Sequence, residues 1–148
     1  RFEWQFSLGS IVALFHDVII TIGIFSILSL EINLSIIAAV LTIVGYSMND
    51  TVVIFDRIRE NLKKYAKISI SDISNVSTNE TLSRTIITSL TTLLALFSIY
   101  IFGGAILKGF SFAMIIGVVV GTYSSIFVAT PILNYTNVSQ KTILKEDN

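Results

Sequence analysis

The 148-residue chain has no cysteine, one proline and one histidine, and charged residues make up only 14% of it. Without cysteine it can form neither disulfides nor catalytic or metal sites that depend on a thiolate. A lone His16 also excludes a histidine-rich metal site. Positive and negative residues number ten each, so no net charge attracts nucleic acid.

Apolar residues are correspondingly frequent: they make up 53% of the chain, and its mean hydropathy is +0.79. Soluble domains carry about 25% charged residues, so this composition is typical of a membrane protein. Four stretches reach the roughly 20 apolar residues that a membrane-spanning helix needs: 6–30, 32–55, 82–102 and 110–133. We expect Pro131 to end the last one. The sequence predicts one all-α domain, 1–148, an integral membrane bundle of four transmembrane helices.

Lysine and arginine in short loops mark the cytoplasmic side of a membrane protein. Most of the positively charged residues fall on one side of the expected spans: Arg1, Arg57, Arg59, Lys63, Lys64, Lys67, Lys141 and Lys145. Arg84 lies just inside that edge, and only Lys108 lies on the other side. We therefore expect both termini and the connection 56–81 to be cytoplasmic.

The connection 56–81 is polar but not featureless. Apolar side chains recur in it at helical spacing, at Ile58, Leu62, Tyr65 and Ile68, with lysine and arginine between them. This pattern fits a helix lying on the membrane surface, and it fits equally a continuation of the second span into water. Ser71–Asp72 is typical of a cap at the start of the next helix.

Three charged residues fall inside the expected spans, on the half near the cytoplasm: Asp17, Asp50 and Arg84. An ionised group inside the membrane costs roughly 2.5–3.5 kcal/mol on insertion scales, and a functional site is the default hypothesis for it. We interpret Asp50 as the strongest candidate. Arg84 is either its partner or an anchor reaching the interface. The His16–Asp17 pair either joins a proton relay with them or locks the first span to its neighbours.

Small and hydroxylated residues repeat at helical spacing and predict close helix packing. In the second span this stripe contains Gly45 and Asn49, with Asp50 at its margin. In the fourth, Gly117 and Gly121 form a G-x-x-x-G motif that is followed by Ser125. A stripe of threonines in the third span predicts packing, with a wet path as the alternative.

Motifs for soluble chemistry are missing. The chain has no glycine-rich phosphate loop, no G-x-S-x-G and no H-E-x-x-H motif. We therefore expect neither an enzyme nor a bound cofactor or metal.

Four segments resemble the SecF family, membrane subunits of the bacterial protein-export machinery with transporter architecture of the RND type. They are ALFHDVIIT at 13–21, VGYSMNDTVVIFDRIREN at 44–61, TLSRTIITS at 81–89 and FGGAILKGFSFAMIIGVVVGTYSSIFVA at 102–129. They match in order and spacing across essentially the whole chain. The second segment has Asn-Asp-Thr where the related SecD subunits have Asp-Ala-Asn, and this favours SecF.

The resemblance implies a location, a fold and partners. SecF-like proteins lie in the bacterial inner membrane and have six spans with a periplasmic domain between the first two, so this chain would hold only the last four spans. They pair with a SecD subunit, work beside the SecYEG channel, and use the proton gradient to help export secreted polypeptides. The family's intramembrane aspartate and arginine match Asp50 and Arg84.

Two functions therefore stand as expectations. In the first, Asp50 gains and loses a proton as the bundle rearranges, Arg84 tunes it, and His16 and Asp17 orient the neighbouring helix or extend the path. In the second, the chain is a structural assembly subunit that docks onto a partner bundle without moving protons. A small-molecule exporter of the RND type has no support beyond shared architecture.

Overall fold

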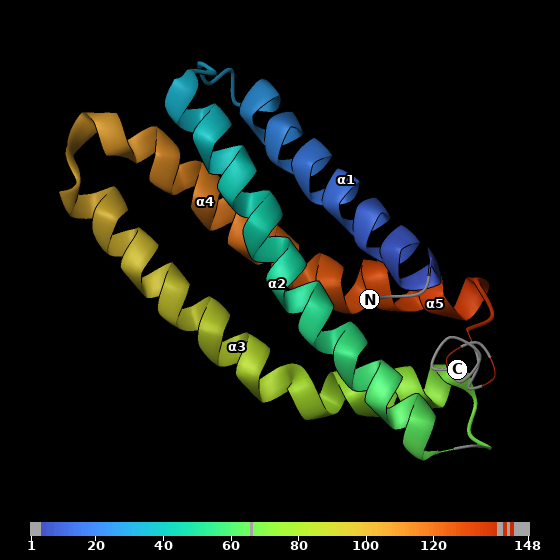
Figure 1. The fold of residues 1–148 in the computed structure, drawn as a ribbon. Coiled ribbons are helices and arrows are strands. Elements are labelled where there is room, and N and C mark those ends of the chain that lie inside the picture. The colour runs from blue at the N-terminus through green and yellow to red at the C-terminus, as the bar shows by residue number, and fades with distance from the viewer. Residues whose placement is uncertain (1–3, 66, 139–140, 142, 144–148) are drawn as a thin grey trace.

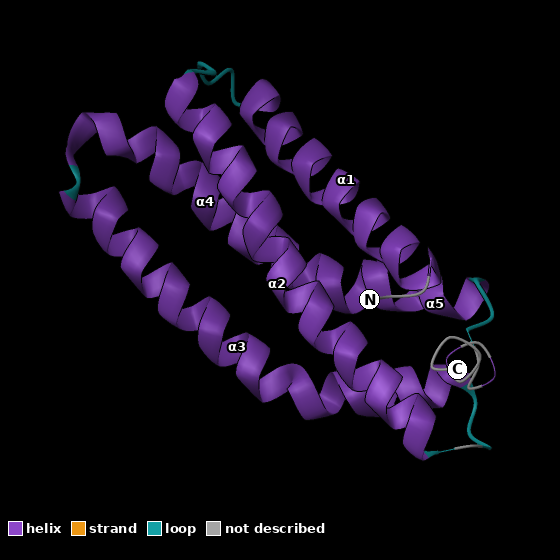
Figure 2. Ribbon diagram, in the orientation of Figure 1, coloured by secondary structure: helices purple, strands orange, loops and turns teal. Residues whose placement is uncertain are grey.

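The computed structural model describes residues 4–65, 67–138, 141 and 143, and all regular structure in them is helical (Figure 2). The helices are α1 (Trp4–Ile27), α2 (Leu34–Lys64), α3 (Ile70–Phe102), α4 (Gly104–Ser124), the π-helical turn η1 (Ser125–Ala129) and α5 (Thr130–Tyr135). Four helical stretches are long and apolar enough to cross a membrane: α1, α2, α3 and the run Gly104–Tyr135. The predicted all-α bundle is confirmed.

Two short turns lie at one end of the bundle, which we call the hairpin end (Figure 1). Asn33 begins α2, since its side-chain oxygen accepts a hydrogen bond from the Ile36 amide at 3.1 Å. Gly104, with φ +75°, makes the turn from α3 into α4 in a conformation that only glycine adopts freely. At the opposite, loop end, α2 gives way to α3, and α1 begins beside α5.

The connection 56–81 is largely helical in the structure. α2 continues without a break to Lys64, and α3 begins at Ile70, so the second of the two alternatives, a continuation of the second span, describes this segment. The cause is burial: Ile58 and Leu62 pack against Ile73 in the core at the loop end. Both α2 and α3 exceed 30 residues. At about 1.5 Å per residue they are longer than a hydrocarbon layer of about 30 Å, so they extend beyond it.

The helix cap expected at Ser71–Asp72 lies two residues earlier, at Ser69. Its hydroxyl oxygen accepts a hydrogen bond from the Asp72 amide at 3.2 Å and donates one to the Asp72 carboxylate at 2.7 Å. Of the cations used to predict the orientation, Arg1 and Lys145 lie outside the described residues.

The expectation that Pro131 ends the fourth helix is wrong. The helical path passes through the π turn and continues to Tyr135. Pro131 lies in the first turn of α5, where an N–H group has no partner within the helix, so the missing N–H of proline removes no hydrogen bond of α5. The wider π turn just before it absorbs the mismatch, and the Thr130 hydroxyl donates to the Ser125 carbonyl, five residues back, at 3.1 Å.

The bundle has two apolar cores, one at each end. The core at the hairpin end includes Phe25, Ile43 and Val118, and the core at the loop end includes Phe6, Phe55 and Leu133. α2 and α4 make the most extensive helix contact, and their close approach depends on Gly117. A Cβ atom there would lie 2.2 Å from Ile43 Cγ1. Between the two cores, the buried side chains are mostly polar.

Candidate functional site

We call the zone between the two cores the polar layer. All the long helical stretches contribute to it, and its buried members are Asp17, Thr21, Ser47, Asp50, Thr51, Thr85, Ser89, Ser124 and Ser125. Helices in membranes associate through small and hydroxylated residues of this kind. The layer also contains the two aspartates that the sequence singled out.

Asp50 is buried, with 4% of its surface exposed. Its Oδ2 atom has no hydrogen-bond partner in the part of the chain that the structure describes. A polar pair beside it is formed by its neighbour Thr51, whose hydroxyl lies 3.0 Å from that of Ser125 in the π turn. A buried carboxylate oxygen without a partner is costly, whereas the protonated acid costs far less. Asp50 therefore has the environment of a group that exchanges a proton.

Arg84 projects from α3 with its side chain exposed. Its positive charge acts on the Asp50 carboxyl across the space between α3 and α2. In the described part of the chain no ion pair within 4.0 Å joins them; the ion pairs found there include His16 with Asp17 and Arg57 with Glu60 and Glu80. The structure thus brings the predicted pair into one neighbourhood without locking it together.

Asp17 is fully buried, and both of its carboxylate oxygens have partners. The Ser47 hydroxyl of α2 donates a hydrogen bond to Oδ2, and His16 Nδ1 lies 3.2 Å from Oδ1. The Thr21 hydroxyl donates to the Asp17 backbone carbonyl at 2.8 Å. The side chain of Asp17 therefore links α1 to α2.

The predicted packing residues divide into two groups. Gly117, Gly121 and Ser125 lie at buried helix contacts, and a Cβ on Gly121 would meet Ser47 Cβ at 3.3 Å. Gly45 and Asn49 are exposed, and a Cβ on Gly45 would meet nothing within 4 Å. Among the described residues, these two make no packing face.

The face of α2 that is buried is not the one predicted from the sequence. Ser47 and Thr51 repeat at a spacing of four residues after Ile43, and this continuation of the apolar pattern was the available signal. Ser89 on α3 was also missed, and its hydroxyl lies 2.7 Å from that of Thr122 on α4. Ser89 is not part of the predicted threonine stripe, and its hydrogen bond joins α3 to α4.

A second polar cluster joins α2 to α3 near the loop end. Arg57 Nε donates to Glu80 at 2.7 Å, and Asn61 Nδ2 donates to Glu80 at 2.9 Å and to the Ser77 hydroxyl at 2.9 Å. Glu80 lies outside the expected spans. The hydrogen bond from Arg57, and then that from Asn61, lowers the pKa of its carboxyl. Arg57 is therefore occupied by this cluster and is not a partner for Asp50.

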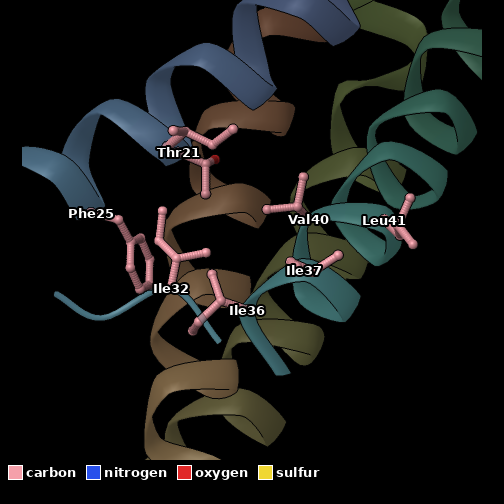
Figure 3. Close-up of a pocket in the computed structure, with 8 residues that line it drawn as sticks. Thr21, Phe25, Ile32, Ile36, Ile37, Val40 and Leu41 are labelled. Atoms are coloured by element: carbon pink, nitrogen blue, oxygen red, sulfur yellow. The ribbon is translucent and has the colours of Figure 1, made fainter. Parts of the chain in front are cut away.

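Two cavities bear on the site in different ways. One cavity, of about 230 Å³, lies between α1 and α2 near the hairpin end. Phe25 and Ile36 are among the side chains that line it (Figure 3). No charged residue lines it, so it contains no group that would bind a proton. The other, of about 220 Å³, lies between α3 and the η1–α5 segment, with Ser74, Thr130 and Asn134 among its residues.

The second cavity is polar and only partly satisfied. Ser74 Oγ and Asn134 Oδ1 are buried atoms that have no hydrogen-bond partner among the described residues. From this cavity, Thr130 bonds to the Ser125 carbonyl, and the Ser125 hydroxyl pairs with Thr51 beside Asp50. Polar groups therefore continue from the cavity to the neighbourhood of Asp50. In the described part of the chain, no group of three His, Asp or Glu residues could hold a metal ion.

Comparison with known proteins identifies the family. The sequence profile described as "Protein export membrane protein SecD/SecF, C-terminal" matches residues 1–139. The chain belongs to the SecD/SecF family. The protein translocase subunit SecF of Rhodothermus marinus is 62% identical over 139 residues, which cover 90% of this chain and 45% of that protein. SecF of Cereibacter sphaeroides is 55% identical over 140 residues, covering 95% of this chain and 43% of the relative.

Solved SecDF structures have the same arrangement of helices. The structure of SecDF from Thermus thermophilus, described as a translocon-associated membrane protein, superimposes with a TM-score of 0.88 at 47% identity and covers 93% of this chain. A SecDF structure in a super-membrane-facing form gives 0.89 at 44% identity and covers all of it. The matched parts are 19% and 20% of those chains. The chain is thus a multi-pass membrane protein that spans less than half the length of the two SecF relatives described above.

Proposed function

We propose that this chain is the proton-responsive membrane part of a SecF-type subunit, which uses the proton gradient to assist protein export across the bacterial inner membrane. Family membership supplies the class of process. One observation carries the assignment of the site: Asp50 is buried in the bundle, and one of its oxygens has no partner among the described residues. Intramembrane acids of this kind mark proton relays in transporters.

The geometry suggests how Asp50 would couple protons to movement. A nearby cation favours the carboxylate, and burial favours the neutral acid. Arg84 acts on Asp50 from a different helix and is not bonded to it, so a shift of α3 relative to α2 changes the balance. A membrane potential supplies about 2.3 kcal/mol per charge per 100 mV, which is enough to bias a two-state bundle.

Proton access is supported from the loop end. The polar cavity between α3 and α5 opens there, and hydroxyl groups continue from it to Thr51, next to Asp50. Lysine and arginine are concentrated at the same end, so we assign the loop end to the cytoplasm. If a cysteine introduced at Lys67 reacted only with thiol reagents added from the periplasmic side, that assignment would be wrong.

The proposed partners are a SecD-type subunit, the SecYEG channel, a secreted polypeptide, membrane lipid and protons. The exposed stripe with Gly45 and Asn49 on α2 supports a helical partner. Small and polar residues that face outward from a membrane helix favour close contact with a second protein over contact with lipid. We assign this surface to the SecD-type subunit.

The decisive experiment replaces Asp50 by Asn in the complete protein, assembled with its SecD-type partner in membrane vesicles. Asparagine keeps the size and removes the exchangeable proton. We expect the gradient-dependent part of export to disappear and the gradient-independent part to remain. Asp56→Asn, an exposed aspartate further along the same helix, is the matched control. Unchanged gradient dependence in Asp50→Asn would reject Asp50 as the proton carrier.

The assembly-subunit alternative is favoured by one set of contacts. Asp17–Ser47 and Ser89–Thr122 are direct hydrogen bonds between helices, as expected in a docking scaffold. If assembly is the whole task, the double variant Asp50→Asn, Arg84→Gln retains export, because the pair's hydrogen-bonding capacity is largely kept. Loss of export with normal recovery of the SecD-type partner would exclude this alternative.

A further inference from the structure

The proposed function leaves the other buried aspartate without a role. Asp17 is more deeply buried than Asp50, but its two oxygens are occupied by the Ser47 hydroxyl and by His16 Nδ1. Both oxygens of Asp17 are thus engaged in contacts that hold the side chain in place, whereas Asp50 has an oxygen without a partner among the described residues.

The contact with Ser47 places Asp17 directly behind the proton site. Ser47 precedes Asp50 by three residues on α2, a rise of about 4.5 Å, and both are on the buried side of the helix. Since a helix is stiff over one turn, the position of Ser47 determines the position of Asp50. Gly121 of α4 gives this junction its space: a Cβ there would lie 3.3 Å from Ser47 Cβ and 3.7 Å from Asp17 Oδ2.

Few other ionisable groups surround this junction. The elements packed against α1 are α2, α4, η1 and α5. On α2 the nearest are Tyr46, next to Ser47, and Asp50, since the remaining charges begin at Asp56, and α4 carries only Lys108 and Tyr123. η1 carries none and α5 only Tyr135. Lys108 lies near the hairpin end, so within the described helices hydrogen bonds and His16 hold Asp17, and no lysine or arginine does.

We infer that Asp17 is a positioning residue for the proton site: through Ser47 it fixes α2 against α1 at the height of Asp50, and it carries no proton in the transport cycle. This inference rests on the proposed function, in which Asp50 is the carrier. Of the two roles that the sequence left open for Asp17, membership of a proton relay or a lock between helices, the inference takes the second.

The two roles respond differently to asparagine. In the Asp17→Asn variant the new side chain has one oxygen, which can accept the Ser47 hydrogen bond, and one NH₂ group, which can donate to His16 Nδ1. Asp17→Asn therefore preserves both contacts and removes only the ability to titrate. Asp17→Ala removes the contacts, and Ser47→Ala removes the same link from the other helix without touching an ionisable group.

The experiment compares these variants in the complete protein with its SecD-type partner, at matched membrane levels, and measures gradient-dependent export across a range of pH. We expect Asp17→Asn to retain the wild-type rate and pH profile. Asp17→Ala should lower the rate by about tenfold or more, the scale of a small misplacement at a reacting centre. Ser47→Ala should shift the pH profile in the same direction as Asp17→Ala, and the double variant should shift it no further. Ser26→Ala, on the exposed face of α1, is the control.

Two results would overturn the inference. If Asp17→Asn abolishes gradient-dependent export as Asp50→Asn does, Asp17 carries protons. If Ser47→Ala and Asp17→Ala leave the pH profile unchanged, the contact does not position Asp50. Should Asp17→Ala fail to accumulate in the membrane, Ser47→Ala and Asp17→Asn still decide the question. Failure of the proposed function itself is separate, because it would appear as normal gradient dependence in Asp50→Asn.

Discussion

Asp17 and Asp50 lie about one helical turn apart in height, yet their surroundings differ. Both are buried, at 0% and 4% exposure. Every carboxylate oxygen of Asp17 has a partner, whereas Asp50 has an oxygen without one in the described structure and a cation nearby that does not bond to it. Burial alone therefore does not identify a working acid in a membrane bundle. The unsatisfied oxygen does, because a bound proton removes its cost.

The neighbouring helices differ in the same way. Around Asp17, Gly121 allows α4 to approach closely, and the helices are joined by direct hydrogen bonds. Around Asp50, the π turn of η1 widens the helix beside Thr51, and the polar cavity lies further along the same segment. π turns within α-helices are frequent at functional sites. The Asp17 side is thus fixed, and the Asp50 side has the features of a place that can rearrange.

Substituting leucine at each aspartate should separate the two acids most strongly. In Asp50→Leu we expect gradient-dependent export to be abolished while the melting temperature in detergent is unchanged or higher, since an unsatisfied polar group is replaced by an apolar one. Asp17→Leu strands Ser47 and His16, so it should lower the free energy of unfolding by about 1.5–3 kcal/mol, the range for hydrogen bonds to charged groups. Far-ultraviolet circular dichroism during heating measures the stability of the two variants, and the export assay measures the loss of gradient-dependent export. Equal destabilisation by the two changes would remove the distinction between them.

Much of this arrangement could be predicted from the sequence. Run lengths and composition gave four membrane helices, and the cost of an intramembrane charge singled out Asp50. The resemblance of the quoted segments gave the family. The helical continuation at the loop end was one of two alternatives that the sequence left open, since Ile58 and Leu62 recur at helical spacing within a segment of polar average composition.

Other features could not be predicted from local patterns. The stripe through Gly45 and Asn49 is as regular as the face through Ile43, Ser47 and Thr51, and only the positions of α1 and α4 decide which is buried. A proline such as Pro131 normally ends a helix, whereas here a π turn precedes it, and that turn contains Ser125, whose hydroxyl contacts Thr51 of α2. The difference between Asp17 and Asp50 likewise depends on tertiary hydrogen bonds.

Substituting two glycines of α4 perturbs the bundle less, one in the apolar core and the other at the junction of Asp17 with Ser47. Gly117→Ala places a Cβ about 2.2 Å from Ile43 in an apolar core, so we expect overpacking to cost about 1–3 kcal/mol of stability. Gly121→Ala meets Ser47 at 3.3 Å and should destabilise less, yet disturb export more for each kcal/mol lost, because Ser47 positions Asp50. Thermal unfolding and export assays of the same preparations give both quantities.

The control for the glycine pair is Ile43→Ala, which removes the clashing atoms and should restore stability to Gly117→Ala but not to Gly121→Ala. A Gly121→Ala protein with wild-type export and lowered stability would contradict the positioning role of the Ser47 junction.

The smallest expected effect comes from Thr51→Val, which removes one hydroxyl from α2 a single turn beyond Ser47. Its partner Ser125 keeps a second hydrogen bond, donating to the Gly121 carbonyl at 2.9 Å, so no buried donor is stranded. We expect the free energy of unfolding to fall by at most about 0.5–1.5 kcal/mol, the range for one neutral hydrogen bond. Ser47→Ala should cost more, because it leaves a buried carboxylate oxygen without its donor. Thermal unfolding of the two variants side by side measures the difference, and a larger loss in Thr51→Val would mean that the Asp50 side of the polar layer, not the Asp17 side, holds the helices together.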